Sequence, residues 1–280
     1  MTTGQVTALA GQELPPAARR ERIAVRDLSK TFGPVISALR VFEGVSFTVY
    51  EGEFVALVGP SGCGKSTILN IVSGLIPATG GEIRINGAPQ KSGHILRQAG
   101  YVFQRDTVFP WRTVAQNIGY GLEIQGLPKA ERDARVNRVI AQARLGGFAD
   151  TYPLELSGGM RQRVALMRTL IMEPQILLMD EPFGALDTHT KLGMHEILLD
   201  VWERERQTVL FVTHDLSEAL TLADRIFVLS ARPGRIKEVF DVGFPRPRDP
   251  VALRESNAYS EMFARIWHSL GEEFAAHMPD

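Results

Sequence analysis

The feature of this sequence that most constrains its fold is a glycine-rich stretch at residues 59–67, which reads Gly-Pro-Ser-Gly-Cys-Gly-Lys-Ser-Thr. Residues 54–58 before it have the apolar pattern of a buried strand, and residues 65–74 after it place apolar side chains at helical spacing and end in glycine. In such a strand–loop–helix unit, backbone N–H groups surround a phosphate, the lysine reaches the β and γ oxygens and the serine binds Mg²⁺. The stretch therefore predicts a nucleotide phosphate site that uses Lys65 and Ser66.

A pair of adjacent carboxylates follows a second apolar run. Residues 176–179 read Ile-Leu-Leu-Met and predict a buried strand, and its end presents Asp180 and Glu181 beside the predicted loop. We expect Asp180 to hold Mg²⁺, directly or through water, and Glu181 to polarise the attacking water. These two elements alone fit many nucleotide-binding proteins, including small-molecule kinases and GTPases.

The rest of the chain predicts an α/β fold with a mostly parallel sheet. The carboxyl half alternates helices and strands, which is typical of a parallel sheet with helical cover; the expected elements are a helix from 157, a strand at 176–179, a helix at 190–206, a strand at 208–213, a helix at 216–223 and a strand at 225–229. Residues 25–49, and a hairpin turn after residues 83–85, predict an antiparallel β subdomain near the amino end. A helical insertion is expected from Thr113, which forms a capping-box pattern with Gln116, through a second helix at about 128–145.

The stretch between the two phosphate elements is what separates this chain from kinases and GTPases. Leu156-Ser157-Gly158-Gly159-Met160-Arg161-Gln162-Arg163 resembles the signature of ABC transporter ATPases. Physically it is a helix N-terminus, with a serine cap and two glycines that leave N–H groups open to an anion. The resemblance implies a phosphate-loop (RecA-like) core with an N-terminal antiparallel β subdomain and an α-helical insertion; the implied parts are a disordered lead at 1–22, the ATPase domain at 23–245 with its helical subdomain at about 105–165, and a connector and terminal helix at 246–280.

The resemblance also gives roles to residues that carry little signal alone. Gln104 follows the strand at 100–103, and His214 follows the strand at 209–213, as in the family; Phe32 matches the aromatic that stacks on adenine, with Phe42 as a competitor. The implied catalytic residues are Glu181, His214 and Lys65. The implied ATP-binding residues are Phe32, Gly59, Pro60, Ser61, Gly62, Cys63, Gly64, Lys65, Ser66, Thr67, Gln104 and Asp180, joined by Ser157, Gly158 and Gly159 of a second copy. The implied Mg²⁺ ligands are Ser66, Gln104 and Asp180.

Further motifs resemble the nitrate/sulfonate/taurine-type importer ATPases: Phe109-Pro110-Trp111-Arg112, Met160 in place of the usual glutamine, and the Phe-Pro-Arg-Pro-Arg run at 244–248. This resemblance implies ATP-driven uptake of a small anion or related organic compound by a head-to-tail homodimer, together with separate transmembrane permease subunits and, indirectly, an extracytoplasmic solute-binding protein. Phe109 and Trp111 are expected either to contact the permease or to belong to the hinge core. The alternative is a non-transport ABC ATPase acting on nucleic acid or the ribosome, although the sequence shows neither the long coiled-coil insertion nor the second cassette typical of those relatives.

Composition bears on the remaining choices. The 31 Lys+Arg and 32 Asp+Glu residues give a formal net charge of -1, so no summed basic field directs the chain to nucleic acid. The apolar runs are far shorter than the roughly 18 residues of a spanning helix. The single cysteine, Cys63, excludes an internal disulfide, and we expect it to fill a loop position instead of acting as a reactive thiol. We therefore expect a protein bound peripherally to the cytoplasmic face of the cell (inner) membrane, with no nucleic-acid partner.

Overall fold

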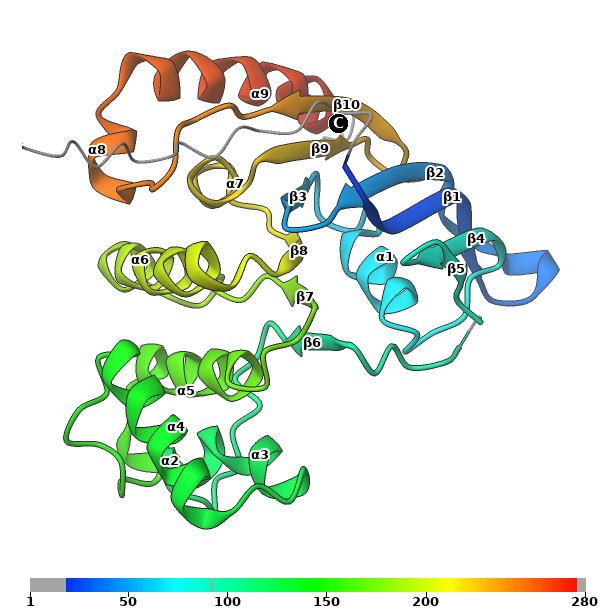
Figure 1. Ribbon diagram of the computed structural model, residues 1–280. Coiled ribbons are helices and arrows are strands. Elements are labelled where there is room, and N and C mark those ends of the chain that lie inside the picture. Colours follow the sequence, from blue (N-terminus) through cyan, green and yellow to red (C-terminus); the bar gives the residue numbers. More distant parts are fainter. Residues whose placement is uncertain (1–18, 92, 276–280) are drawn as a thin grey trace, which may run out of the picture.

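The computed structural model describes residues 19–91 and 93–275 and consists of two sheets with a helix between them (Figure 1). The larger sheet has six strands in the spatial order β10 (Ile236–Asp241), β9 (Arg225–Leu229), β3 (Phe54–Val58), β8 (Thr208–Val212), β7 (Ile176–Asp180) and β6 (Ala99–Val102). All neighbouring pairs in it are parallel except β10 with β9. The α/β fold and its mostly parallel sheet are therefore confirmed.

The smaller sheet is the antiparallel subdomain predicted near the amino end. Its order is β2 (Leu39–Tyr50), β1 (Glu21–Phe32), β4 (Gly80–Ile85) and β5 (Ala88–Pro89). β4 and β5 are joined by Asn86 and Gly87, both with positive φ, as the predicted hairpin turn requires. β1 begins at Glu21, inside the predicted lead of 1–22, and residues 1–18 of that lead lie outside the described residues.

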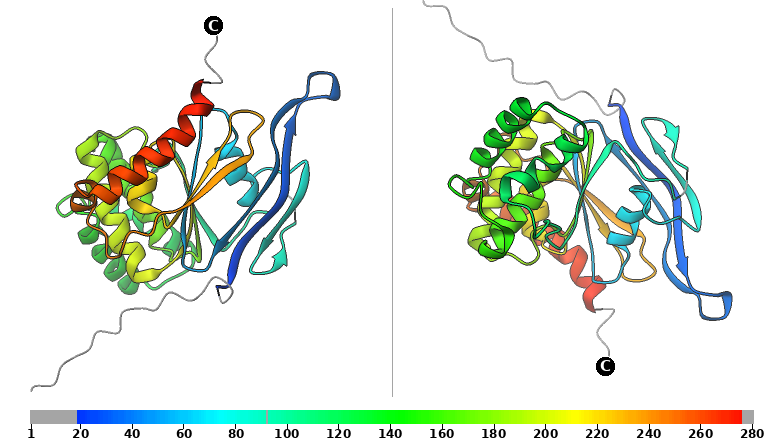
Figure 2. Two further views of the ribbon diagram at one scale, coloured as in Figure 1. Left: turned by 90° about the horizontal axis from the view of Figure 1, so that it is seen from above. Right: turned by 90° about the horizontal axis from the view of Figure 1, so that it is seen from below.

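The helices of the described residues fall into three groups (Figures 1 and 2). α1 (Lys65–Val72) lies between the two sheets. The helical insertion is made of α2 (Val114–Ile118), α3 (Tyr120–Ile124), α4 (Lys129–Gln142) and α5 (Gly158–Leu170), and a single 3₁₀ turn (Pro153–Glu155) precedes α5. The far face of the larger sheet is covered by α5, α6 (Thr188–Glu205), α7 (Leu216–Leu222) and α9 (Asn257–Ala275), and α8 (Pro250–Arg254) packs against α6, α7 and α9. A second 3₁₀ turn (Val35–Ser37) joins β1 to β2.

Side chains that alternate along the central strands explain this layering. On β3, Val55 and Leu57 pack into the core shared with α1 and the smaller sheet, whereas Phe54, Ala56 and Val58 pack into the core under the other helices. All five are buried, so β3 carries an uninterrupted apolar run, as a strand covered on both faces must. The buried run before the glycine-rich loop thus fixes that loop at the centre of the sheet.

Two arginines of the predicted connector, Arg246 and Arg248, bind it to the ATPase domain. Arg246 donates to the backbone oxygen of Leu222 and pairs with Asp224 at 2.7 Å. Arg248, whose side chain is 2% exposed, donates to the backbone oxygens of Thr221 and Ala223. These arginines satisfy the carbonyl end of α7, where helical partners are missing, so the arginine run at 244–248 anchors the segment that leads into α8 and α9.

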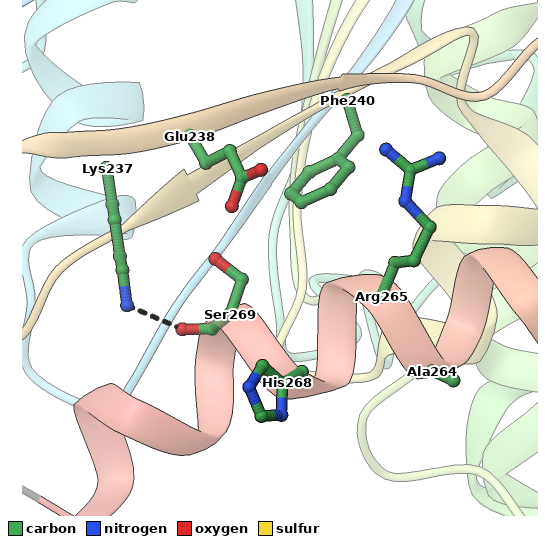
Figure 3. Close-up of a pocket in the computed structure, with 7 residues that line it drawn as sticks. All are labelled: Lys237, Glu238, Phe240, Ala264, Arg265, His268 and Ser269. Carbon is green, nitrogen blue, oxygen red and sulfur yellow. Dashed lines mark hydrogen bonds between the residues drawn. The ribbon is translucent and has the colours of Figure 1, made fainter.

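The terminal helix α9 packs against β10 of its own chain. Figure 3 shows Lys237 of β10 donating to the backbone oxygen of Ser269 on α9, a distance of 2.8 Å. The same ammonium pairs with Glu273 at 3.2 Å. The sequence did not predict β10, because only Phe240 of its six side chains is buried and the strand has no clear apolar alternation.

Candidate nucleotide-binding and hydrolysis site

The proposed site residues gather where four parallel strands end. β3 leads into the glycine-rich loop, β6 into Gln104, β7 into Glu181 and β8 into His214. Because these strands are parallel neighbours, their carboxyl ends lie at one edge of the sheet. This edge is where open α/β sheets bind their ligands, so the topology brings together residues that are up to 155 positions apart in the sequence, as the numbers of Gly59 and His214 show.

The glycine-rich loop has the backbone geometry of a phosphate cradle. Gly62 and Gly64 have φ values of +79° and +106°, which only glycine adopts without strain, and Gly64 is the N-cap of α1. Lys65 is buried, and its ammonium donates to the backbone oxygens of Gly59 and Pro60 at 2.8 and 3.0 Å. The lysine is thus held against the loop itself, within reach of any anion the loop surrounds.

Cys63 packs into the apolar core beneath this loop. Its side chain is fully buried, and burial raises the pKa of its thiol above the ordinary value. A thiol of this kind is not activated as a nucleophile. The expected packing role is therefore the one the structure supports.

Ser66 and Asp180 meet beside the loop. The Ser66 hydroxyl donates to Asp180 Oδ1 at 2.7 Å, which joins α1 to the end of β7. Burial raises the pKa of Asp180, and the adjacent Glu181 acts in the same direction, while the Ser66 hydrogen bond opposes them. Tyr101 also faces this carboxylate: burial and Asp180 together raise the pKa of its phenol, whose hydroxyl donates to Asn70 at 2.8 Å. Tyr101 and Asn70 are site neighbours that sequence analysis missed.

The Glu181 carboxylate contacts the two remaining polar side chains of the predicted site, Gln104 and His214. Its Oε2 accepts from Gln104 Nε2 at 3.3 Å and lies 2.9 Å from His214 Nδ1. The Glu181 backbone has a φ of +44°, an uncommon conformation for a side chain of this size, and its N–H donates to the Val212 oxygen at 2.9 Å. Strained residues of this kind cluster at functional sites because their surroundings hold them in place.

A buried polar cluster stands behind His214. Thr213 Oγ1 donates to Glu218 at 2.6 Å and accepts from the Asp215 N–H at 3.0 Å. Lys191 of α6 then pairs with both carboxylates, at 2.9 Å from Glu218 and 3.0 Å from Asp215. Thr213 and Asp215 flank His214 in the sequence, so the cluster fixes the turn that presents the imidazole.

The signature segment forms the helix start that its sequence predicts, at a separate place. Ser157 is the N-cap of α5, and its hydroxyl accepts from the Met160 N–H at 3.3 Å. Gly159 lies so close to Thr190 that an added Cβ would approach its Cγ2 to 2.6 Å. Among the described residues, no hydrogen bond joins Ser157 or Gly159 to the glycine-rich loop of the same chain.

The structure also separates the two aromatic candidates for adenine stacking. Phe42 is fully buried and cannot stack on a ligand, because it packs against the loop from behind, near Gly64. Phe32, at the end of β1, is 42% exposed, with the Lys30 ammonium 4.6 Å from its ring centroid. Of the pair, only Phe32 is available, and its stacking role stays a prediction.

Comparison with known proteins decides the family. Residues 42–184 match the family described as ABC transporter. An uncharacterised ABC transporter ATP-binding protein of Methanocaldococcus jannaschii is 45% identical over 232 residues, which is 83% of this chain and 86% of that protein. The chain belongs to the ABC transporter family.

Other relatives of this ABC ATPase carry a more specific description. An aliphatic sulfonates import ATP-binding protein of Bacillus cereus is 40% identical over 244 residues, covering 87% of this chain and 94% of that protein. The protein of the same description from Bacillus anthracis is 42% identical over 246 residues, with coverage of 88% and 96%. The resemblance to the sulfonate-type importer ATPases is thereby confirmed.

Two solved structures of one similar cassette protein are dimers. A dimeric cassette in a post-hydrolysis state, bound to ADP and Pi, is 31% identical, with a TM-score of 0.69 over 79% of this chain and 100% of that one. A second dimeric structure of the same cassette protein, MJ0796, is 32% identical, with a TM-score of 0.70 and the same coverage. The phosphate-loop fold and ATP hydrolysis predicted for this chain are confirmed by these likenesses.

The residues of this ABC ATPase fit the Mg²⁺ that its chemistry implies. Magnesium prefers hard oxygen ligands in small number, with substrate phosphates and water completing the shell. The Ser66 hydroxyl and the Asp180 carboxylate offer two such oxygens 2.7 Å apart. Within the described residues, no group of three His, Cys, Asp or Glu side chains is arranged to hold a metal.

Proposed function

We propose that this chain is the ATP-hydrolysing subunit of an importer for a small organic anion of the sulfonate class. The observation that carries the proposal is the convergence of Lys65, Ser66, Asp180, Glu181 and His214 at one edge of the sheet. The import role and the solute class are supported by relatives described as aliphatic sulfonates import ATP-binding proteins. Residues that select the solute belong to other polypeptides, so the solute rests on that likeness.

The chain's own residues divide the work of hydrolysis. Lys65 and the loop N–H groups bind the β and γ phosphates. Ser66, Asp180 and Gln104 are the residues that would hold Mg²⁺, which would neutralise phosphate charge when bound. Glu181 takes the role of general base or water polariser, and His214, held 2.9 Å from it, fixes the geometry of the water and contacts the γ-phosphate. Positioning and electrostatics supply most of the rate.

The complete site requires two copies of the chain. Ser157 and the N-terminus of α5 offer open N–H groups and a helix dipole to an anion. Since they are not bonded to the loop of their own chain, we assign them to the ATP of a second copy facing head to tail. Dimeric relatives support this arrangement. Cleavage of the shared ATP then weakens the dimer and resets the transporter.

The contact with a permease is assigned to the turn around Trp111. No helix in the described part of the chain has both the length and the apolar character to cross a bilayer. From the likeness to importer ATPases, we place the protein peripherally on the cytoplasmic face of the cell membrane. Asn117 is buried and ties this turn together, because its amide bonds the backbones of Phe109, Arg112 and Thr113. Trp111 is nevertheless 70% exposed. A rigid turn that presents an exposed tryptophan is suited to anchor a partner.

The test is to isolate the tagged chain from its native membranes in mild detergent and to identify the proteins that accompany it by mass spectrometry. A stoichiometric multi-span protein, lost from a Trp111→Ala variant, is the expected result. Trp267→Ala is the matched control, since Trp267 is 56% exposed but lies on α9. Recovery of ribosomal or nucleic-acid-binding proteins in place of a membrane protein would contradict the transport role and leave the ATPase assignment intact.

A further inference from the structure

A turn between β9 and β10 supports the phosphate loop from behind. Arg232 projects from this turn, and its guanidinium donates two hydrogen bonds to the backbone oxygen of Gly62, from Nε at 3.1 Å and Nη2 at 2.9 Å. No motif in the sequence pointed to this contact. It joins the nucleotide loop to a segment 170 residues later in the chain.

Gly234 of the same turn lies directly against the loop. A Cβ on Gly234 would come within 2.2 Å of the Cys63 backbone oxygen, a distance that no side chain could occupy. In the same way, a Cβ on Gly62 would come within 2.8 Å of the Arg232 guanidinium. The two backbones therefore approach each other as closely as glycines permit.

Hydrogen bonds to β2 and α9 hold the turn that carries Arg232 in place. Gly234 donates to the Val41 oxygen at 2.9 Å and accepts from the Glu43 N–H at 3.2 Å, which ties it to β2. On the opposite side, Glu273 of α9 accepts from the Ala231 N–H at 2.8 Å. The pairing of Lys237 with α9 in Figure 3 holds the following strand in the same way.

We propose that Arg232 is a positioning residue of the phosphate loop, which orients the peptide between Gly62 and Cys63 for the nucleotide phosphates. The Gly62 oxygen and the Cys63 N–H are opposite ends of one planar peptide. When the guanidinium holds the oxygen outward, the Cys63 N–H is directed back into the loop, where it donates to the Pro60 oxygen at 3.3 Å and closes the turn that curves around the phosphates. The cationic partner also draws electron density from the peptide and strengthens its N–H as a donor.

The inference rests on the proposed role of the loop in binding ATP, and the experiment tests both separately. KM and kcat for MgATP hydrolysis are measured with Arg232→Ala, Arg232→Lys, Arg235→Ala and Lys65→Ala. Arg235 is the matched control, because it lies on the same hairpin and has the same charge, but its guanidinium pairs with Glu43 at 3.6 Å and not with the loop.

We expect Arg232→Ala to raise KM about tenfold, equivalent to about 1.4 kcal/mol of binding, with kcat changed less than twofold. Arg232→Lys should recover part of the loss, since an ammonium keeps the charge but not the two-pronged geometry. Arg235→Ala should behave as the parent chain. Urea unfolding of each variant separates loss of folded protein from loss of affinity.

Three results overturn the inference: an unchanged KM in Arg232→Ala, an equal rise in Arg235→Ala, or a fall confined to kcat. The first would show that the loop keeps its shape unaided, and the second that only the summed charge matters. If Lys65→Ala also left KM unchanged, the assignment of the loop itself would fail, which is a distinct outcome.

Discussion

Removing the Lys191 ammonium leaves a buried carboxylate without its counter-ion. The Glu218 side chain is 1% exposed and that of Lys191 is 16% exposed, and their charged atoms are 2.9 Å apart. Removal of one partner of a buried pair costs about 3–5 kcal/mol. Glu218 keeps the hydrogen bond from Thr213, so we expect Lys191→Met to lose about 3 kcal/mol of unfolding free energy at pH 7.5, the lower end of that range.

The loss should depend on pH with a defined sign. Burial raises the pKa of Glu218 above its ordinary value of 4.5 even beside Lys191, and the pKa rises further when the ammonium is gone. A carboxyl whose folded pKa is raised binds more protons in the folded state than in the unfolded state, so the variant gains stability as pH falls from 7.5 toward 5. The difference between parent and variant should therefore shrink at lower pH.

The assay is urea unfolding followed by tryptophan fluorescence at pH 7.5 and pH 5.5. Lys129→Met is the control, because it removes a lysine from an exposed pair with Asp133 on α4, where side chains are 80% and 46% exposed and the pair is worth about 0.5 kcal/mol or less. A loss below about 1 kcal/mol in Lys191→Met, or an equal loss at both pH values, would contradict the role of Lys191 as the counter-ion of the buried Glu218 carboxylate.

Three further substitutions test separate parts of the account. Ser157→Ala removes the N-cap of α5 and should lower the unfolding free energy by about 1 kcal/mol. The ATP affinity of the monomer should stay unchanged while steady-state hydrolysis falls, and hydrolysis at the parental rate would exclude Ser157 from the ATP site of the second copy. Phe32→Ala should raise the KM for ATP about tenfold, since aromatic stacking on a base is worth about 1–3 kcal/mol, whereas Phe32→Tyr should leave it unchanged. Equal KM values in the parent and both variants would show that Phe32 does not contact the adenine. Arg248→Met leaves the carbonyls at the end of α7 without their buried donor and should lower the unfolding free energy by about 2 kcal/mol. Arg138→Met, on the exposed face of α4, is the control and should cause no change. Equal urea midpoints for the two variants would contradict the anchoring role of Arg248.

Local sequence patterns predicted the elements whose signals are local. The strand before Gly59, the Ser157 cap and the capping box of Thr113 with Gln116 appear as expected, because neighbouring residues alone determine them. Ordered motifs then allowed distant residues such as Gln104 and His214 to be placed in one site through the family resemblance. Their contacts with Glu181 follow from the order of the parallel strands, which residue patterns do not state.

The features that sequence patterns did not predict depend on contacts between segments that are distant in the chain. The strained φ of Glu181 is held by β8, and the support of Gly62 by Arg232 crosses 170 positions. One of the six side chains of β10 is buried, so its sequence pattern does not predict a strand. Backbone pairing with β9 makes the segment a strand. An Arg-Pro-Gly run predicts a turn, but nothing in it indicates that the arginine reaches the nucleotide loop.

The role of Glu181 in activating water within a dimer is tested by comparing ATP binding, single-turnover hydrolysis and dimer mass in Glu181→Gln and Lys65→Ala. We expect Glu181→Gln to bind MgATP within about twofold of the parent, to hydrolyse it at least about 100-fold more slowly and to accumulate as an ATP-bound dimer, whereas Lys65→Ala should lose ATP binding. Hydrolysis by Glu181→Gln at the parental rate would contradict the role of Glu181 in activating water.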